Sequence, residues 1–161
     1  MARTSIVTDS TSGLSPEEVR PLGIAIIPMH IEIDGRTYHE GVDLALPEFY
    51  QLVGADSLMP STSPPTIREF HALFRELARE SDEILVITLS SRLSNTVHVA
   101  RQAAQSFMGR AHITVIDSRL TATPLGWLAL AAAEAAAANV DVAEIVHLLR
   151  AMMPHMYLAF F

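Results

Sequence analysis

Residues 83–96 read EILVITLSSRLSNT, and this stretch decides the fold class of the chain. Its first six residues, Glu83–Thr88, form a continuous apolar run of strand length, which is typical of a strand buried on both faces. A polar loop over Ser90–Thr96 follows, and the pattern after it predicts a helix near Thr96–Phe107. A strand, a loop and a helix in this order are half of a βαβ unit, so we expect parallel strands.

The same alternation of short apolar runs and helical patterns continues on both sides of this stretch. Further strands are predicted at Ser5–Thr8, Ile24–Ile33, Arg36–Tyr38 and His112–Ile116. Further helices are predicted over Ser15–Gly23, from Leu46, from Ile67 to Leu77, over Pro124–Ala138 and over Val142–Met152. Asp34-Gly35 is typical of a tight hairpin turn, and Asp56–Thr66 is expected to be a loop. The sequence therefore predicts an α/β fold, with a mostly parallel sheet flanked by helices in a Rossmann-like layer architecture.

The length of 161 residues fits one domain, and we assign residues 1–155 to it. The last residues, Tyr157–Phe161, are apolar and are expected to start another strand. Apolar chain ends need burial against something, so we interpret this end as a chain cut short.

Composition and charge exclude several classes of function. The net charge of -7 argues against a sequence-neutral nucleic-acid binder, because such proteins need clustered cations. All 11 cations are arginines, so there is no lysine for a P-loop or a Schiff base. There are no cysteines, which excludes disulfides, thiolate nucleophiles and cysteine-based zinc sites.

No segment has the pattern of a membrane span or a secretory leader. The most apolar stretch, Leu125–Ala138, is interrupted by Glu134 and falls short of the roughly 18–20 residues that a span needs. Residues 1–9 lack a long apolar run after a charge cluster. We therefore expect a soluble, cytoplasmic protein.

Three polar loops, Thr8–Ser12, Ser90–Thr96 and Asp117–Arg119, lie at or near expected strand ends, where open α/β sheets bind ligands. A fourth loop rich in hydroxyl groups, Ser61–Thr66, precedes a helix. Hydroxyl groups and the N–H groups of helix starts bind anions without a base, so a carboxylate or a phosphate could lie between Thr62-Ser63 and Ser94–Thr96. Each loop alone is more typical of ordinary caps and turns, but four on one edge favour a site.

Catalytic, metal and cofactor sites have less support. There is no G-x-S-x-G motif and no evident acid to orient His98 beside Ser94. No G-x-G-x-x-G motif occurs, so no dinucleotide cofactor is expected. The histidines show no metal-ligand spacing, and the one grouping worth weighing, His30 and His39 with Asp43, is not sufficient to predict a metal site.

The four loops resemble those of the N-terminal domain of DegV proteins, which are bacterial fatty-acid-binding proteins. The matching motifs are Val7–Ser12, Thr62–Thr66, Leu89–Thr96 and Val115–Ser118. Each motif is weak alone, but the four together are fairly specific, and their order and spacing match the family along the whole chain.

The resemblance implies a function and a set of site residues. DegV proteins bind one long-chain fatty acid between two domains, with the carboxylate held by hydroxyl loops and the acyl chain in an apolar tunnel. The resemblance assigns the head group to Thr62 and Ser94, with Ser63, Asn95 and Thr96 beside them. It also implies a carrier that presents the fatty acid to a separate fatty acid kinase subunit, rather than an enzyme. The family's second domain is absent here, and residues 156–161 resemble the strand that leads into it.

Two alternatives stay open. Pro64 stands where the family usually has Gln, Asn95 where it has Gly, and Val97 where it has Tyr, so the ligand is less determined than the fold. One alternative is a binder or enzyme for a phosphorylated small molecule at the same loops. The other is a scaffold half that functions only with a partner domain.

Overall fold

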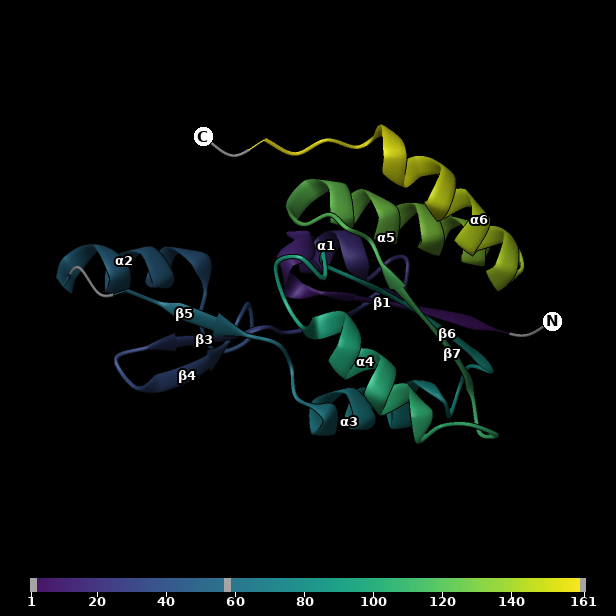
Figure 1. Ribbon diagram of the computed structural model, residues 1–161, viewed down its shortest axis with the longest axis horizontal. Helices are drawn as coiled ribbons and strands as arrows, with labels where there is room; N and C mark the ends of the chain where they lie inside the picture. Colours follow the sequence, from purple (N-terminus) through teal and green to yellow (C-terminus); the bar gives the residue numbers. More distant parts are fainter. Residues whose placement is uncertain (1–2, 57–58, 160–161) are drawn as a thin grey trace.

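The computed structural model describes residues 3–56 and 59–159, which form two sheets (Figure 1). The larger sheet has four parallel strands in the order β2-β1-β6-β7. Its strands are β1 (Thr4–Asp9), β2 (Ala25–Ile27), β6 (Glu83–Thr88) and β7 (His112–Asp117). The helices around it are α1 (Pro16–Val19), α3 (Ile67–Leu77), α4 (Thr96–Gln105), α5 (Ala122–Ala137) and α6 (Val142–Met152). This arrangement confirms the predicted α/β fold.

Strand β6 is buried on both faces, as its continuous apolar run predicted. Leu85 and Ile87 pack in one core cluster with residues of α5 and α6. Ile84 and Val86 pack in a second cluster with residues of α3 and α4. Alternate residues of a strand point to opposite faces, so each face of the sheet receives its own core. The two helix layers lie on opposite sides of the sheet (Figure 1).

The smaller sheet is antiparallel, with the order β4-β3-β5. Its strands are β3 (His30–Ile33), β4 (Arg36–His39) and β5 (Ser61–Ser63), and helix α2 (Leu46–Asp56) packs on it. Ile31, Ile33 and Leu44 form its core. This unit projects away from the two helix layers, beyond the carboxyl ends of the parallel strands (Figure 1).

Two of the local predictions in this unit are wrong. Ile24–Ile33 is not one strand but two, β2 and β3, which belong to different sheets. Pro28 has no N–H, and the N–H of Met29 donates to Ser10 Oγ at 2.8 Å, so neither residue offers an N–H to a strand ladder. Strand β5 lies within Asp56–Thr66, for which the sequence predicts a loop. The three residues of this strand are all polar, so they show no apolar alternation that would indicate a strand.

The predicted strand at the chain end is not formed over residues 157–159. A short 3-10 helix, η2 (Met153–His155), follows α6 and ends before these residues. A strand needs a neighbour for its N–H and C=O groups, and no strand lies alongside these residues in the described part of the chain. Residues 160–161 of this prediction, and 57–58 of the predicted loop, lie outside the described residues.

Two of the helices begin at capping boxes. Ser15 and Glu18 form a reciprocal capping box at the start of α1, and Thr66 and Glu69 form another at the start of α3. Helix α1 is shorter than predicted, because Pro21 has no N–H with which to continue it. The backbone then turns at Gly23, with a φ of 63°, before β2. None of the described helices is long and apolar enough to cross a bilayer.

Gly126 lets α5 approach the loop after β1. A Cβ atom at this position would lie 2.7 Å from the carbonyl oxygen of Ser12, which is backbone and has to move. We expect Gly126→Ala to lower the free energy of unfolding by about 1–3 kcal/mol, measured by urea denaturation. The matched control is Gly54→Ala in α2, where a Cβ meets no atom within 4 Å, so the change should stabilise by about 0.5–1 kcal/mol. Equal stabilisation by both changes would contradict the close approach.

Candidate ligand site at the carboxyl edge of the sheet

The direction of the chain connections reverses between β1 and β6. Strand β2 lies on one side of β1, and β6 and β7 lie on the other, so the connections leave in opposite directions at this point. Open α/β sheets bind ligands at such a switch point, outside the carboxyl ends of the strands. Three of the predicted hydroxyl loops follow β1, β6 and β7, and the smaller sheet lies beyond the same edge (Figure 1).

Asp9 ties the loops after β1 and β6 together. Its side chain is fully buried. One carboxylate oxygen accepts hydrogen bonds from the N–H (3.2 Å) and hydroxyl (2.6 Å) of Thr11, and the other accepts from the N–H of Leu89 at 2.7 Å. Burial raises the pKa of Asp9 above its ordinary value, outweighing these hydrogen bonds. Asp9 is therefore a structural carboxylate that holds these two loops together.

Asp117 holds the next loop in a similar way. Its Oδ1 accepts hydrogen bonds from the N–H groups of Ser91 and Arg119, each at 3.1 Å. Burial alone would raise the pKa of Asp117, but these hydrogen bonds and the charge of Arg119 hold it below its ordinary value. Asp9 and Asp117 thus each hold the turn that follows a parallel strand.

Ser94 and Asn95 directly precede α4, and Thr96 is its first residue. The hydroxyls of Ser94 and Thr96 lie 2.9 Å apart, and Thr96 is fully buried and also points to the sulfur of Met29 at 3.5 Å. Asn95 is exposed, and its side chain makes no capping hydrogen bond. The N-terminus of α4 therefore lacks a side-chain cap, beside two paired hydroxyl groups.

Thr62 and Ser63 lie on β5 of the smaller sheet and are exposed. In the ladder between β3 and β5, Ser63 is the partner of His30 and Thr62 is the partner of Ile31. His30 follows Met29, the residue that Thr96 contacts. The two predicted hydroxyl motifs are thus connected through Met29 and through His30, the first residue of β3. Their binding of a ligand head group stays a prediction.

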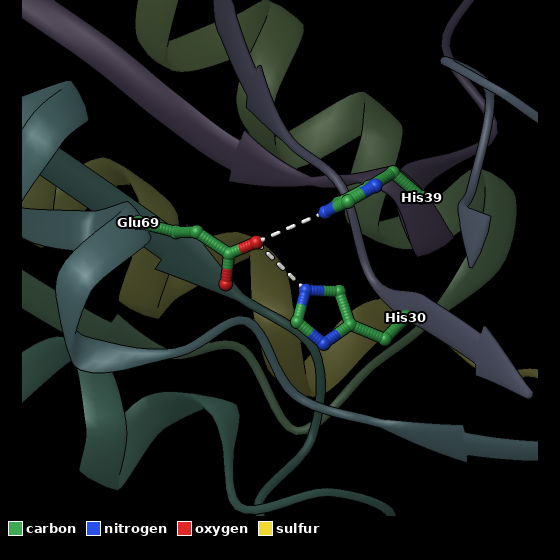
Figure 2. A group of neighbouring side chains, drawn as sticks. All are labelled: His30, His39 and Glu69. Atoms are coloured by element: carbon green, nitrogen blue, oxygen red, sulfur yellow. Dashed lines mark hydrogen bonds and ion pairs between the residues drawn. The ribbon is translucent and has the colours of Figure 1, made fainter. Parts of the chain in front are cut away.

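A cluster of His30, His39 and Glu69 lies at the base of the smaller sheet, and the sequence did not predict it (Figure 2). Both histidine Nε2 atoms point at Glu69 Oε1, at 2.8 Å from His30 and 3.2 Å from His39. His30 and His39 are direct partners in the β3–β4 ladder, which brings their rings to 5.0 Å. The predicted hairpin turn at Asp34-Gly35 was the signal that could have paired them.

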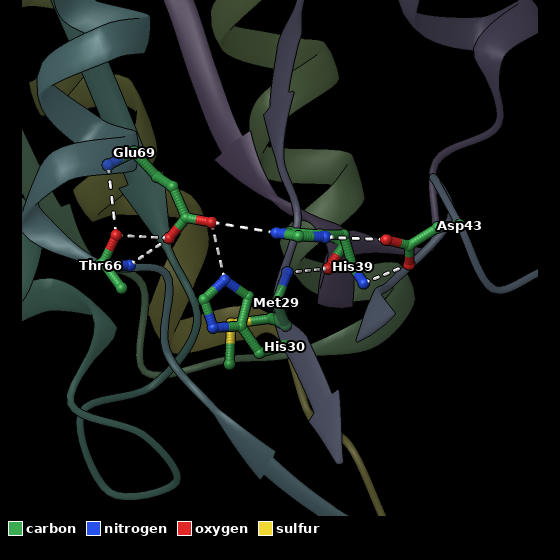
Figure 3. Close-up of polar contacts among 7 residues, drawn as sticks. Met29, His30, His39, Asp43, Thr66 and Glu69 are labelled. Atoms are coloured by element: carbon green, nitrogen blue, oxygen red, sulfur yellow. Dashed lines mark hydrogen bonds and ion pairs between the residues drawn. The ribbon is translucent and has the colours of Figure 1, made fainter. Parts of the chain in front are cut away.

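Two further residues fix the orientation of this cluster (Figure 3). Asp43 accepts from His39 Nδ1 at 2.9 Å, and this hydrogen bond, with Glu69, raises the pKa of His39 above its ordinary value. Thr66 donates its N–H and its hydroxyl to Glu69 Oε2, each at 2.6 Å. Burial opposes ionisation of Glu69, but the hydrogen bonds from Thr66 and His30 lower its pKa to about 2.

Two mainly apolar grooves open elsewhere on the surface. One, of about 650 Å³, lies between α5 and α6 and is lined by Trp127, Met152, Met156 and Tyr157, among others. The other, of about 320 Å³, lies beside Ser10, Leu14 and Ile26. Neither groove is lined by the predicted head-group residues, so the acyl tunnel stays a prediction.

The chain is similar to known proteins both in sequence and in structure. A family profile described as an uncharacterised protein of the DegV family matches residues 3–161. A DegV domain-containing protein of Deinococcus radiodurans is 38% identical over 156 residues, covering 97% of this chain and 55% of that protein. A second, from Staphylococcus aureus, is 39% identical over 146 residues, covering 91% of this chain and 51% of that protein. The chain thus spans about half the length of these relatives.

Solved structures give the same family. The structure of DegV from Bacillus subtilis, described as a fatty acid binding protein, has a TM-score of 0.91 at 30% identity and covers 96% of this chain and 55% of its own. A DegV family protein from Thermus thermophilus, described by its fatty acid binding, has a TM-score of 0.87 at 29% identity, covering 94% of this chain and 54% of its own. These matches confirm the resemblance seen in the sequence: the chain belongs to the DegV family.

Proposed function

We propose that this chain supplies one half of a binding site for a long-chain fatty acid and acts as a carrier. The observation that supports this most directly is the close structural match to the fatty acid binding protein of Bacillus subtilis along almost the whole chain. The chain spans about half of that protein, so a second half is expected to complete the site. As a carrier, the chain would present the fatty acid to a separate fatty acid kinase subunit, which is its proposed partner.

The head group is proposed to bind Thr62 and Ser94, with Ser63, Asn95 and Thr96 as their immediate surroundings. A thioether sulfur is a weak hydrogen-bond acceptor, so Thr96 gains little from pointing at Met29. An arriving carboxylate would let Thr96 donate to Ser94, and Ser94 in turn donate to the ligand. The N–H groups at the start of α4, which no side chain caps, add favourable polarity for an anion.

The energetics favour a carrier over a catalyst. Burying an acyl chain contributes about 0.8 kcal/mol per CH₂, so the tail supplies most of the affinity and the hydroxyls orient the head group. Uncharged hydroxyls also leave the carboxylate nucleophilic, which a partner kinase needs in order to form an acyl phosphate. The same hydroxyl loops would suit a phosphorylated small molecule, and the experiment below separates the two ligands.

The test measures oleate binding by native mass spectrometry and titration calorimetry. The chain is used alone and joined to the second half of the Bacillus subtilis relative. We expect the joined form to bind one oleate and the double variant Thr62→Ala/Ser94→Ala to bind it about 100-fold more weakly, since two hydrogen bonds to a charged group are lost. Ser106→Ala, an exposed hydroxyl at the other end of α4, is the matched control and should bind oleate as the unaltered chain does.

Two outcomes would overturn parts of this proposal. Unchanged oleate affinity in the double variant, with an intact circular dichroism spectrum, would remove Thr62 and Ser94 from the head-group site. If no fatty acid binds to either form while inorganic phosphate does, the phosphorylated-ligand alternative replaces the carrier.

A further inference from the structure

We propose that His30, His39 and Glu69 bind a divalent first-row transition-metal ion, for which Zn²⁺ is the probe. The three side chains each offer one ligand atom, and these atoms lie within 4.8 Å of one another. Two imidazoles and one carboxylate are a ligand set that zinc sites use when the fourth position is left to water. The proposal goes beyond fatty acid binding and does not depend on it.

The distances suit a metal centre with little rearrangement. Ligand atoms at about 2.0–2.2 Å from a tetrahedral zinc ion lie roughly 3.3 Å from each other. Glu69 Oε1 is 2.8 Å from His30 Nε2 and 3.2 Å from His39 Nε2. The two Nε2 atoms and Glu69 Oε1 therefore lie at separations close to those between zinc ligands (Figure 2). An ion bound among these three atoms would replace the protons of the present hydrogen bonds.

The residues behind the ligands have the arrangement that metal sites require. A metal-bound histidine nearly always donates its other N–H to a carboxylate or carbonyl, which fixes the tautomer. His39 Nδ1 makes this contact with Asp43 Oδ2 at 2.9 Å (Figure 3). The second oxygen of Glu69 is held by Thr66, which leaves Oε1 directed at the histidines. Both histidine rings are carried by one hairpin, whose ladder fixes their separation.

Charge and exposure also fit a bound cation. With neutral histidines, the cluster holds two carboxylates, Glu69 and Asp43, whose charge one divalent ion balances. The side chains of His30, Glu69 and His39 are 13%, 31% and 40% exposed, so the site is shielded on one side and open to solvent on the other. This opening gives an ion its entry path and leaves room for a water ligand.

The chain contains a natural comparison for this cluster. His112 Nδ1 lies 2.8 Å from Glu83 Oε2, which is the same type of contact as that between His30 and Glu69. In the described part of the chain, His30, His39 and Glu69 are the one grouping of three such ligands found, and the pair of His112 with Glu83 lacks a third member. A single pair binds metal weakly, so it makes a matched control.

The experiment titrates the metal-free chain with Zn²⁺ by calorimetry and with Co²⁺ by visible absorption. We expect one equivalent of each ion to bind, with a Co²⁺ spectrum of tetrahedral or five-coordinate type. His30→Gln, His39→Gln and Glu69→Gln should each weaken Zn²⁺ binding by at least about 100-fold, and Asp43→Asn by about 10–100-fold. His112→Gln should leave the affinity unchanged. Glutamine at position 69 keeps the capping box, so α3 should still form.

Two results would overturn the proposal. The first is the absence of Zn²⁺ binding to the unaltered chain at tens of micromolar. The second is stoichiometric binding by the double variant His30→Gln/His39→Gln with its circular dichroism spectrum unchanged, which would place the ion elsewhere.

Discussion

Replacing Asp9 by Ala is expected to lower the free energy of unfolding by about 2–4 kcal/mol at neutral pH. The change leaves two N–H groups, those of Thr11 and Leu89, without their acceptor next to a fully buried position. It also frees the loops after β1 and β6 from each other, so the proposed binding of fatty acid should weaken as well. Urea denaturation followed by circular dichroism measures the first effect.

Asp117→Ala is the control for Asp9→Ala. Asp117 also accepts from two backbone N–H groups, but these contacts are exposed, and water can replace its carboxylate there. We expect a loss of about 1 kcal/mol or less. An equal loss in both variants would show that burial is not what makes Asp9 important.

The effect of Asp9 should also depend on pH, in a direction set by its raised pKa. Burial raises the pKa of Asp9 in the folded state. Such a group stabilises the fold most when both states are protonated, and this stabilisation is lost as pH rises through the folded pKa. The stability difference between the unaltered chain and Asp9→Ala should therefore be largest below about pH 3.9 and narrow above it. A difference that widens with rising pH would contradict this reasoning.

Replacing Phe74 by Ala is expected to cost about 3–5 kcal/mol of folding free energy. Phe74 is fully buried on α3 in the core between the sheet and α4. Its ring lies 5.5 Å from that of Phe70 and 5.8 Å from that of Phe107, at 90° to the latter. Truncation therefore leaves a cavity and removes two aromatic pairs at once.

The control for Phe74→Ala is Met108→Ala, because the Met108 side chain is 82% exposed near the same core. It should change the free energy of unfolding by less than about 0.5 kcal/mol. Thermal and urea denaturation of both variants give the comparison. A loss below about 1 kcal/mol for Phe74→Ala would mean that α3 is not packed as described.

The larger sheet could be predicted because the sequence pattern of each of its strands lies within one short segment. Glu83–Thr88 shows burial on both faces in its own apolar run, and the bounds predicted for Val142–Met152 are those observed. The hydroxyl loops were found in the same way, since the position of a loop after a strand follows from chain order. Strand ends and helix starts therefore gave most of the candidate head-group residues.

The smaller sheet and the histidine cluster depend on contacts between distant segments. Ser61–Ser63 becomes a strand only because β3 offers it a ladder. In the sequence, Glu69 has only the pattern of a capping-box residue. Its contact with His30 and His39 depends on how α3 packs against the hairpin. A hairpin turn at Asp34-Gly35 implies that His30 pairs with His39. The predicted strand ended at Tyr38, one residue before His39, so this pairing was not recognised.

The pairing of β1 with β6 has a consequence for how the chain folds during synthesis. Thr4 is aligned with Glu83, so the first strand made waits for its central partner until residues 83–88 have left the ribosome. Closing so long a loop costs entropy that no local contact repays, which slows the step that completes the sheet. Until then one edge of β1 is unpaired, and the apolar side chains of Ile6 and Val7, which are buried in the folded chain, are exposed. An unpaired edge with apolar side chains promotes aggregation with other chains.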